Sequence, residues 1–257
     1  MTTSAVMGVD AGSREVKIVV AGPEGILFTT SVDTIQFYLA CRNGGKELDL
    51  ARLKRLDSAP AWGKVVATGY GRNNLAIKGG QAIPEIMAHA KGAVHQTGIS
   101  TFTLLDMGGQ DIKVASVKDG MVDDFIMNDK CAAGSGRYLE NITYALGADL
   151  QTLGECWEEP ARLSATCAIF GESEVVGMVS DGVPVTSILA GANASVVARL
   201  KPMLMRFKPR VIVATGGVAR NQAVMKLLET EAGVEVVIPK EPQLNGAIGC
   251  VYSQAAR

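Results

Sequence analysis

A pattern of three strands with an acidic turn occurs twice in the chain, and it restricts the fold more than any other feature. Three apolar runs near the N-terminus predict antiparallel strands, with the turn DAGS after the first run, at 6–12, 16–21 and 26–31. The same order returns with the turn DMGGQD after its first run, at 102–106, 112–117 and 122–127. Two matching units predict a duplicated α/β fold, with two lobes and a cleft between them.

The remaining elements complete each unit. Further strands are expected at 64–68, 210–214 and 234–238. Helices are expected at 33–57 with a break at 43–45, at 84–95 with proline in the first turn, and at 134–146, 172–180, 186–206, 219–233 and 243–254. The first lobe is therefore assigned residues 1–98 plus the C-terminal helix 242–257, and the second lobe residues 99–241.

The bulk properties narrow the possible classes of protein. A chain of 257 residues can bury a core in each of two modest lobes. With 47% hydrophobic residues, 20% charged residues and a net charge of −1, it has no basic excess that would indicate a nucleic-acid partner. No apolar run has the length or flanks of a signal peptide or a membrane span. The five cysteines are odd in number and widely spaced, which favours a reducing cytoplasm over a disulfide framework.

Both acidic turns have the residues of a phosphate site. Asp10 ends a strand and could hold hydrated Mg²⁺, while Gly12 and Ser13 offer backbone N–H groups and a hydroxyl to phosphate oxygens. A β-hairpin turn alone would explain either segment. A matching pair is a stronger signal than one turn.

The second turn has the corresponding residues. Asp106 again ends an apolar strand, Gly108 and Gly109 allow close approach, and Gln110 could orient an attacking water.

A third glycine turn follows the strand RVIVA. There Gly216 and Gly217 precede a helix, and Asn221 lies close behind them, so a ligand could lie over the helix N-terminus. Neither a Walker-type loop nor GxGxxG occurs. In this order the three segments resemble the phosphate-1, phosphate-2 and adenosine motifs of the actin-like ATPase superfamily, a ribonuclease H-like fold shared by sugar kinases, heat-shock chaperones and actin. The resemblance implies that ATP or ADP binds with Mg²⁺.

Two cysteines each precede an expected helix. Cys131 stands before AAGSG and Cys167 before AIFGESEVV, where a helix N-terminus favours a thiolate. Their wide spacing fits no CxxC metal motif, so packing and metal ligation both remain open. Two cysteines cannot complete a four-thiolate cluster, although a two-fold dimer supplies four.

The other cysteines and the histidines give weaker signals. The histidines, His89 and His95, have no Cys–His context and are interpreted as helix-face residues, which disfavours a catalytic thiol. Ordinary core or surface positions are expected for Cys41, Cys156 and Cys250.

Longer segments resemble the ATPase activators of 2-hydroxyacyl-CoA dehydratases, which are related to the ATP-binding subunits of benzoyl-CoA reductase. The matching segments run nearly from end to end: ATGYGR at 67–72, DMGGQD at 106–111, NDKCAAGSGR at 128–137, CAIFGESEV at 167–175, ATGGVARN at 214–221 and NGAIG at 245–249. Two departures are CAAGSGRY in place of CAAGTGRF, and Gly171 where alanine is usual. The resemblance implies a homodimer with one bridging [4Fe-4S] cluster, ligated by Cys131 and Cys167.

The same resemblance implies the activity, an ATPase that passes single low-potential electrons to a partner dehydratase or reductase. A reduced ferredoxin or flavodoxin would supply the electrons. The implied roles are Mg²⁺ binding through water for Asp10 and Asp106, water positioning for Gln110, phosphate contacts for Gly12, Ser13, Lys17, Gly108 and Gly109, and adenosine contacts for Gly216, Gly217 and Asn221.

Several alternatives stay open from the sequence. The protein could be the ATP-binding subunit of a benzoyl-CoA reductase or the activator of another iron–sulfur reductase. More distant possibilities are a small-molecule kinase of the same superfamily and a nucleotide-dependent switch or chaperone, neither of which needs Cys131 and Cys167.

Overall fold

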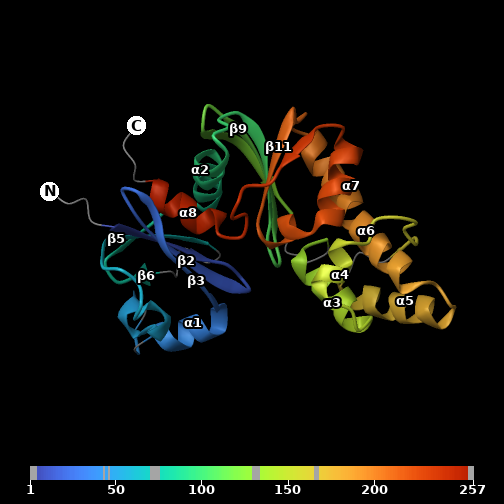
Figure 1. Cartoon of the computed structure of the whole chain (residues 1–257), viewed down its shortest axis with the longest axis horizontal. Coiled ribbons are helices and arrows are strands. Elements are labelled where there is room, and N and C mark those ends of the chain that lie inside the picture. Colours follow the sequence, from blue (N-terminus) through green and yellow to red (C-terminus); the bar gives the residue numbers. More distant parts are fainter. Residues whose placement is uncertain are drawn as a thin grey trace. The chain divides into compact units, whose positions relative to one another are not determined.

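The chain divides into two compact units. The computed structural model describes residues 5–42, 44–45, 47–69, 76–128, 134–164 and 168–253 (Figure 1). Unit 1 contains Met1–Ser100, Asp119–Val122 and Gln243–Arg257, and unit 2 contains Thr101–Lys118 and Asp123–Pro242.

Unit 1 is built on a mixed five-stranded sheet with the strand order β3-β2-β1-β5-β7. The antiparallel part follows from the short turns between β1, β2 and β3, whereas β5 and β7 pair in parallel. The bounds are Ala5–Ala11 for β1, Glu15–Gly22 for β2, Gly25–Asp33 for β3, Trp62–Gly69 for β5 and Gly80–Ala82 for β7. The three antiparallel strands expected at the N-terminus are confirmed.

Helices pack on this sheet because its strands are apolar on both faces. Val9 and Ile18 belong to a core cluster with Phe37 of α1 (Thr34–Cys41). Alternate residues such as Val19 pack instead with Ile248 of α8 (Asn245–Tyr252). α8 lies beside α2 (Glu85–Thr97), and Pro84 is the residue just before α2 rather than part of its first turn (Figure 1).

The segment after α1 differs from the sequence expectation. In place of a second helix up to residue 57, the chain forms β4 (Glu47–Leu48), which pairs with β6 (Ala76–Ile77), and two short 3₁₀ turns, η1 (Leu50–Arg52) and η2 (Lys54–Leu56). The Asp49 carboxylate accepts a hydrogen bond from Ala51 N at 3.1 Å, which starts the first of these turns. Four leucines at helix-like intervals still reach the core from this irregular backbone: Leu48, Leu50, Leu53 and Leu56.

Unit 2 repeats the sheet of unit 1. Its strand order is β10-β9-β8-β11-β12, with β8 and β9 antiparallel and with β11 parallel to both β8 and β12. The bounds are Phe102–Met107 for β8, Ile112–Lys118 for β9, Met121–Met127 for β10, Val211–Thr215 for β11 and Glu235–Val237 for β12. The internal repeat expected from the sequence is therefore present in the strand topology.

Five helices and a 3₁₀ turn are described in unit 2. They are α3 (Gly136–Ala145), α4 (Leu150–Gly154), α5 (Ala168–Ser180), α6 (Val185–Met205), α7 (Gln222–Ala232) and η4 (Gly217–Arg220). The large core of this unit joins the sheet to these helices through residues such as Leu105, Tyr138 and Ile188. α4 was not expected, because five residues are too few to show a helical period. No described helix is both long and apolar enough to cross a membrane.

A glycine in β1 permits the close packing of α8. A Cβ atom at Gly8 would collide with the carbonyl of Ala247 and lie 2.9 Å from Val251 Cγ2. We expect Gly8→Ala to lower the free energy of unfolding of unit 1 by about 1–3 kcal/mol, because overpacking forces the helix away from the sheet. Gly45→Ala is the matched control, since a Cβ there meets nothing within 4 Å. Urea unfolding followed by circular dichroism measures both, and equal stability of the two variants would contradict this packing.

Candidate nucleotide and metal site

The first acidic turn, Asp10–Lys17, is closed by a backbone hydrogen bond from Gly12 N to Glu15 O at 3.1 Å. Asp10 is 5% exposed and lies opposite Lys17 in the β1–β2 register. Lys17 Nζ donates to Glu15 O at 3.3 Å, and a Cβ at Gly12 would lie 2.9 Å from that same oxygen. Glycine therefore lets the turn stay tight while Ser13 remains only half-buried.

The second acidic turn, Asp106–Lys113, has the same closure, with Gly108 N donating to Asp111 O at 2.9 Å. Asp106 is 3% exposed and faces Lys113 in the β8–β9 register, as Asp10 faces Lys17. Lys113 Nζ lies 2.6 Å from Asp111 Oδ2 and 3.9 Å from Asp106 Oδ2. Thr215 Oγ1 also donates to Asp106 Oδ1 at 2.9 Å, which fixes this buried carboxylate.

Lys113 is a site residue that the sequence analysis missed. DAGSREVK and DMGGQDIK place a lysine at the same step after each aspartate, so the internal repeat already contained the signal. Gly108 and Gly109 are half-buried and Gln110 is exposed. These three therefore lie where a ligand can reach the turn.

Each acidic turn is also crossed by a glycine from a neighbouring strand. Gly69 and Gly216 have φ angles of 120° and 86°, and each follows Ala-Thr in the sequence. A Cβ at Gly69 would lie 2.6 Å from Ala11 C, and one at Gly216 would lie 2.6 Å from Met107 C. The start of ATGYGR is thus the counterpart in unit 1 of the start of ATGGVARN in unit 2. Tyr70–Arg72 of the first motif lie outside the described residues.

The residues expected near adenosine have different surroundings. Gly217 begins η4 and is exposed, and a Cβ there would meet nothing within 4 Å. Asn221 is the N-cap of α7, where its Oδ1 accepts from Val224 N at 3.0 Å. Its Nδ2 donates to Asn193 Oδ1 at 2.9 Å. The polar atoms of the Asn221 side chain thus bind protein groups at the start of α7.

A candidate cation site lies beside Asp10. One ligand atom each from Asp10, Glu85 and His89 lies within 4.8 Å of the other two, and His89 Nε2 is 3.8 Å from Asp10 Oδ2. His89 is 5% exposed, and a Cβ at Gly246 would lie 2.9 Å from its Nε2. Oxygen and imidazole donors of this kind can hold a divalent cation. The helix-face interpretation of His89 missed this site, although Glu85 and His89 stand one helical turn apart.

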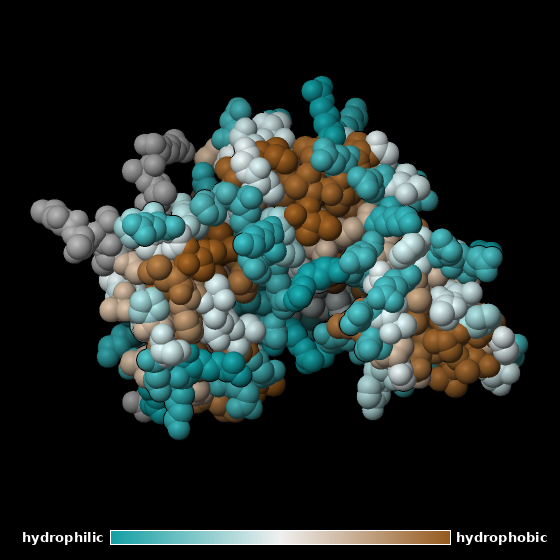
Figure 2. Space-filling model, in the orientation of Figure 1, coloured by the Kyte–Doolittle hydropathy of each residue, from teal (hydrophilic) through white to brown (hydrophobic). Residues whose placement is uncertain are grey.

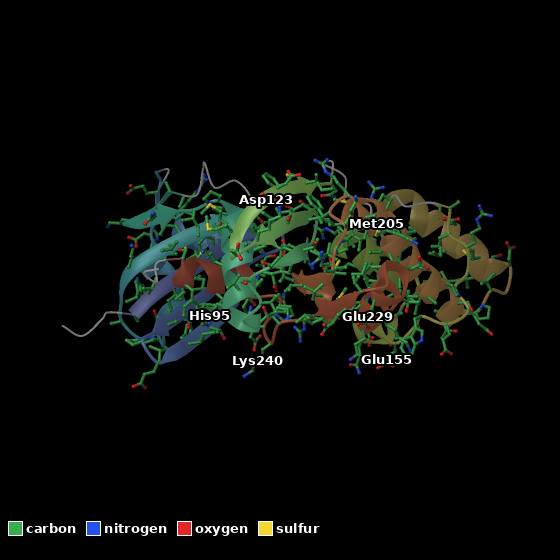
Figure 3. All side chains as sticks on the ribbon, turned by 90° about the horizontal axis from the view of Figure 1, so that it is seen from above. His95, Asp123, Glu155, Met205, Glu229 and Lys240 are labelled. Atoms are coloured by element: carbon green, nitrogen blue, oxygen red, sulfur yellow. The ribbon has the colours of Figure 1, made fainter. Side chains whose placement is uncertain are left out.

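His95 lies away from this group. At the C-terminal end of α2 its ring stacks on Tyr252, with 3.4 Å between the ring centroids (Figure 3). Burial lowers the pKa of His95, which favours the neutral ring in this stack.

The two cysteines of greatest interest, Cys131 and Cys167, lie outside the described residues, in 129–133 and 165–167. The described chain resumes with the N-cap Ser135 of α3 after the first gap, and with α5 after the second. Before the second gap, Ser164 N and Ser164 Oγ both donate to Glu174 Oε1 of α5 at 2.7 Å. Glu174 therefore joins the chain on the two sides of the Cys167 segment, in addition to any capping role.

The three described cysteines do not suit metal ligation. Burial raises the pKa of Cys41 to about 11 and raises that of Cys250 well above its usual value. The pKa of Cys156 is also raised, by burial first and by Glu155 second. Metal ligation requires the thiolate, so these positions favour the protonated thiol.

The paired sheets and acidic turns define an ATPase of the actin-like fold, as the sequence predicted. The chain belongs to the BadF/BadG/BcrA/BcrD ATPase family, whose sequence pattern matches residues 7–252. It is 35% identical to the (R)-2-hydroxyglutaryl-CoA dehydratase activating ATPase of Acidaminococcus fermentans, over 98% of each chain. The family resemblance seen in the sequence is therefore confirmed.

Solved structures agree with this assignment. The activator of the 2-hydroxyisocaproyl-CoA dehydratase from Clostridium difficile, solved with bound ADPNP, superposes with a TM-score of 0.84. It is 32% identical, and the match covers 97% of this chain and 93% of that one. A ROK family protein from Streptococcus pneumoniae, solved with sucrose, has a TM-score of 0.57 at 11% identity, over 97% of each chain, and shares the fold alone.

The lysine of the second acidic turn yields a stability prediction. Lys113→Met removes an ammonium that contacts two carboxylates, one of them buried, so we expect a loss of about 3–5 kcal/mol in the free energy of unfolding. Lys118→Met is the control from the same strand, because Lys118 is 63% exposed in its pair with Asp123. Urea unfolding should leave the control close to wild type. An equally small effect at Lys113 would contradict the buried ion pair.

Proposed function

We propose that this protein is an ATP-dependent one-electron donor that activates a partner enzyme such as a 2-hydroxyacyl-CoA dehydratase. The observation that carries the proposal is the pair of acidic turns with equal closure and register, in a chain that matches a dehydratase activator over nearly its whole length. ATP and water would give ADP and phosphate. One electron would leave the reduced protein for the partner's own acceptor, and ferredoxin or flavodoxin would replace it.

Binding of Mg²⁺·ATP is assigned to the acidic turns. Asp10 and Asp106 would each hold water molecules of the hydrated ion, since both carboxylates end strands and are buried. The N–H groups of Gly12, Gly108 and Gly109, with the Ser13 hydroxyl, would contact phosphate oxygens. Lys17, half-buried beside the first turn, adds a positive charge.

Hydrolysis and nucleotide selection fall to the more accessible residues. Gln110 is exposed at the second turn and would orient the attacking water. Gly216 and Gly217 would border the adenosine, which the open space over Gly217 permits. The contribution of Asn221 would come through the start of α7, because its amide caps that helix.

A cation beside Asp10 would have a second way to bind. Glu85 and His89 lie within direct ligand distance of the Asp10 carboxylate, so Asp10 could bind Mg²⁺ together with Glu85 rather than through water alone. Mg²⁺ prefers oxygen ligands, and the imidazole of His89 would then orient the carboxylate.

An iron–sulfur cluster is assigned to Cys131 and Cys167 of two protomers. The donor chemistry fits, because the described cysteines favour the thiol form and these two remain, each just before a helix. A bound [4Fe-4S] cluster would hold one electron at low potential. Exposed apolar residues on α5, Val176 and Val179, support a second copy as the neighbour of this helix, where hydrophobic surface gathers (Figure 2).

The partner and the setting follow from the relatives. A benzoyl-CoA reductase core or another iron–sulfur reductase would need the same donor, so these remain the alternative acceptors. Thiolate ligands and low-potential electrons require a reducing compartment, and we place the protein in the cytoplasm.

Anaerobic purification tests the cluster. The wild type should be a brown homodimer with about four irons per two chains. Cys131→Ser and Cys167→Ser should each lose the iron and still bind ADPNP, whereas Cys156→Ser should keep both. An iron-free monomer after anaerobic reconstitution would exclude the proposal, and unchanged iron in either variant would exclude that ligand.

Replacement of Asp10 tests the ATPase role. Asp10→Asn keeps the shape of the side chain and removes the charge that would hold the cation. We expect ATP hydrolysis to fall by roughly 10²-fold or more, with iron content unchanged. Normal hydrolysis by this variant, measured as phosphate release at saturating Mg²⁺·ATP, would rule out the assigned role.

A further inference from the structure

The chain on the N-terminal side of the Cys131 segment is fixed to the second acidic turn. Asn128 N donates to Ile112 O at 3.0 Å, and Ile112 N donates to Asn128 Oδ1 at 2.8 Å. Ile112 directly follows Asp111, the residue whose carbonyl closes the turn. One residue therefore holds the last described position before 129–133 against the end of the turn.

The chain on the C-terminal side is fixed to the same turn. Ser135 Oγ donates to Gly109 O at 2.9 Å, Arg137 N donates to Gly109 O at 2.8 Å, and Gly136 N donates to Gly108 O at 3.1 Å. Ser135 is fully buried and caps α3, where its own carbonyl accepts from Tyr138 N at 3.1 Å. The start of α3 thus donates three hydrogen bonds to two carbonyls of the turn.

Packing leaves little room for slack at this contact. A Cβ at Gly136 would lie 3.2 Å from Gly108 O and 3.4 Å from Val218 Cγ2. Further along α3, Tyr138 is fully buried, and its hydroxyl accepts a hydrogen bond from Ser195 Oγ of α6 at 3.1 Å. α3 is therefore held to the turn at its start and to the core behind it.

The peptide groups of the turn connect this contact to a phosphate. The Gly108 carbonyl shares a planar peptide with Gly109 N–H, and the Gly109 carbonyl shares one with Gln110 N–H. In a trans peptide the N–H and C=O point in opposite directions. A phosphate that rotates the N–H groups of Gly109 and Gln110 must therefore rotate the carbonyls that accept from α3.

We propose that Asn128 and Ser135 are positioning residues that transmit phosphate binding at the second acidic turn to both ends of the segment carrying Cys131. The inference rests on the proposed function, and it deepens it, because the coupling lies within unit 2 alone. Unit 1 has a related contact without a cysteine: Thr34 Oγ1, at the start of α1, donates to Gly12 O at 2.8 Å. Thr34→Val is thus a matched control for Ser135→Ala.

Hydrogen–deuterium exchange on the anaerobic full-length protein, with and without Mg²⁺·ADPNP, tests the coupling. In the wild type we expect ADPNP to slow exchange at the start of α3 by roughly tenfold. The change should shrink to less than about twofold in Ser135→Ala and in Asn128→Ala. Ser135→Thr, Asn128→Asp and Thr34→Val should respond like the wild type, because the first two keep the hydrogen-bonding group and the third acts on the other turn.

The outcomes separate the two proposals. A wild type without iron, or without ADPNP binding, overturns the proposed function. A wild type that has both, but whose α3 does not respond to ADPNP, overturns only the coupling. A full response in Ser135→Ala and Asn128→Ala, with iron content and ADPNP affinity unchanged, overturns it as well. If Ser135→Ala does not fold, Asn128→Ala and its Asn128→Asp counterpart decide the question.

Discussion

The structure depends on one short backbone hydrogen bond that closes each acidic turn. It runs from Gly12 N to Glu15 O in unit 1 and from Gly108 N to Asp111 O in unit 2. Closure brings a strand-end aspartate opposite a lysine on the next strand and leaves the glycine amides at the edge of the turn. The site, the position of the crossing glycines and the contacts of the following helix all require this geometry.

The two units have used this common frame for different purposes. In unit 1 the aspartate lies beside Glu85 and His89, which suits it to a cation, whereas in unit 2 it is bound to Thr215 and lies near Lys113. The turn of unit 1 accepts a hydroxyl from α1, and that of unit 2 accepts the start of the helix that follows Cys131. An old nucleotide fold can thus acquire a new function through the helix attached to one turn.

The sequence predicted what depends on local pattern. Alternating apolar runs indicated the strands correctly, and the repeated aspartate–glycine turns indicated Asp10 and Asp106. It missed contacts between distant segments, such as His89 with Asp10 and Ser135 with Gly109, because no periodicity encodes them. The helix expected up to residue 57 was wrong, since leucines spaced like a helix pack just as well from turns. The roles of Cys131 and Cys167 stay predictions, as both lie outside the described residues.

The central claim is that hydrolysis of ATP drives the departure of one electron from this protein. The most direct measurement mixes the reduced protein anaerobically with a dehydratase partner and follows the electron paramagnetic resonance signal of the reduced cluster. Mg²⁺·ATP should abolish that signal as ADP forms, while ADPNP should leave it in place. Hydrolysis of ATP with an unchanged signal, or equal loss of the signal without nucleotide, would contradict the claim.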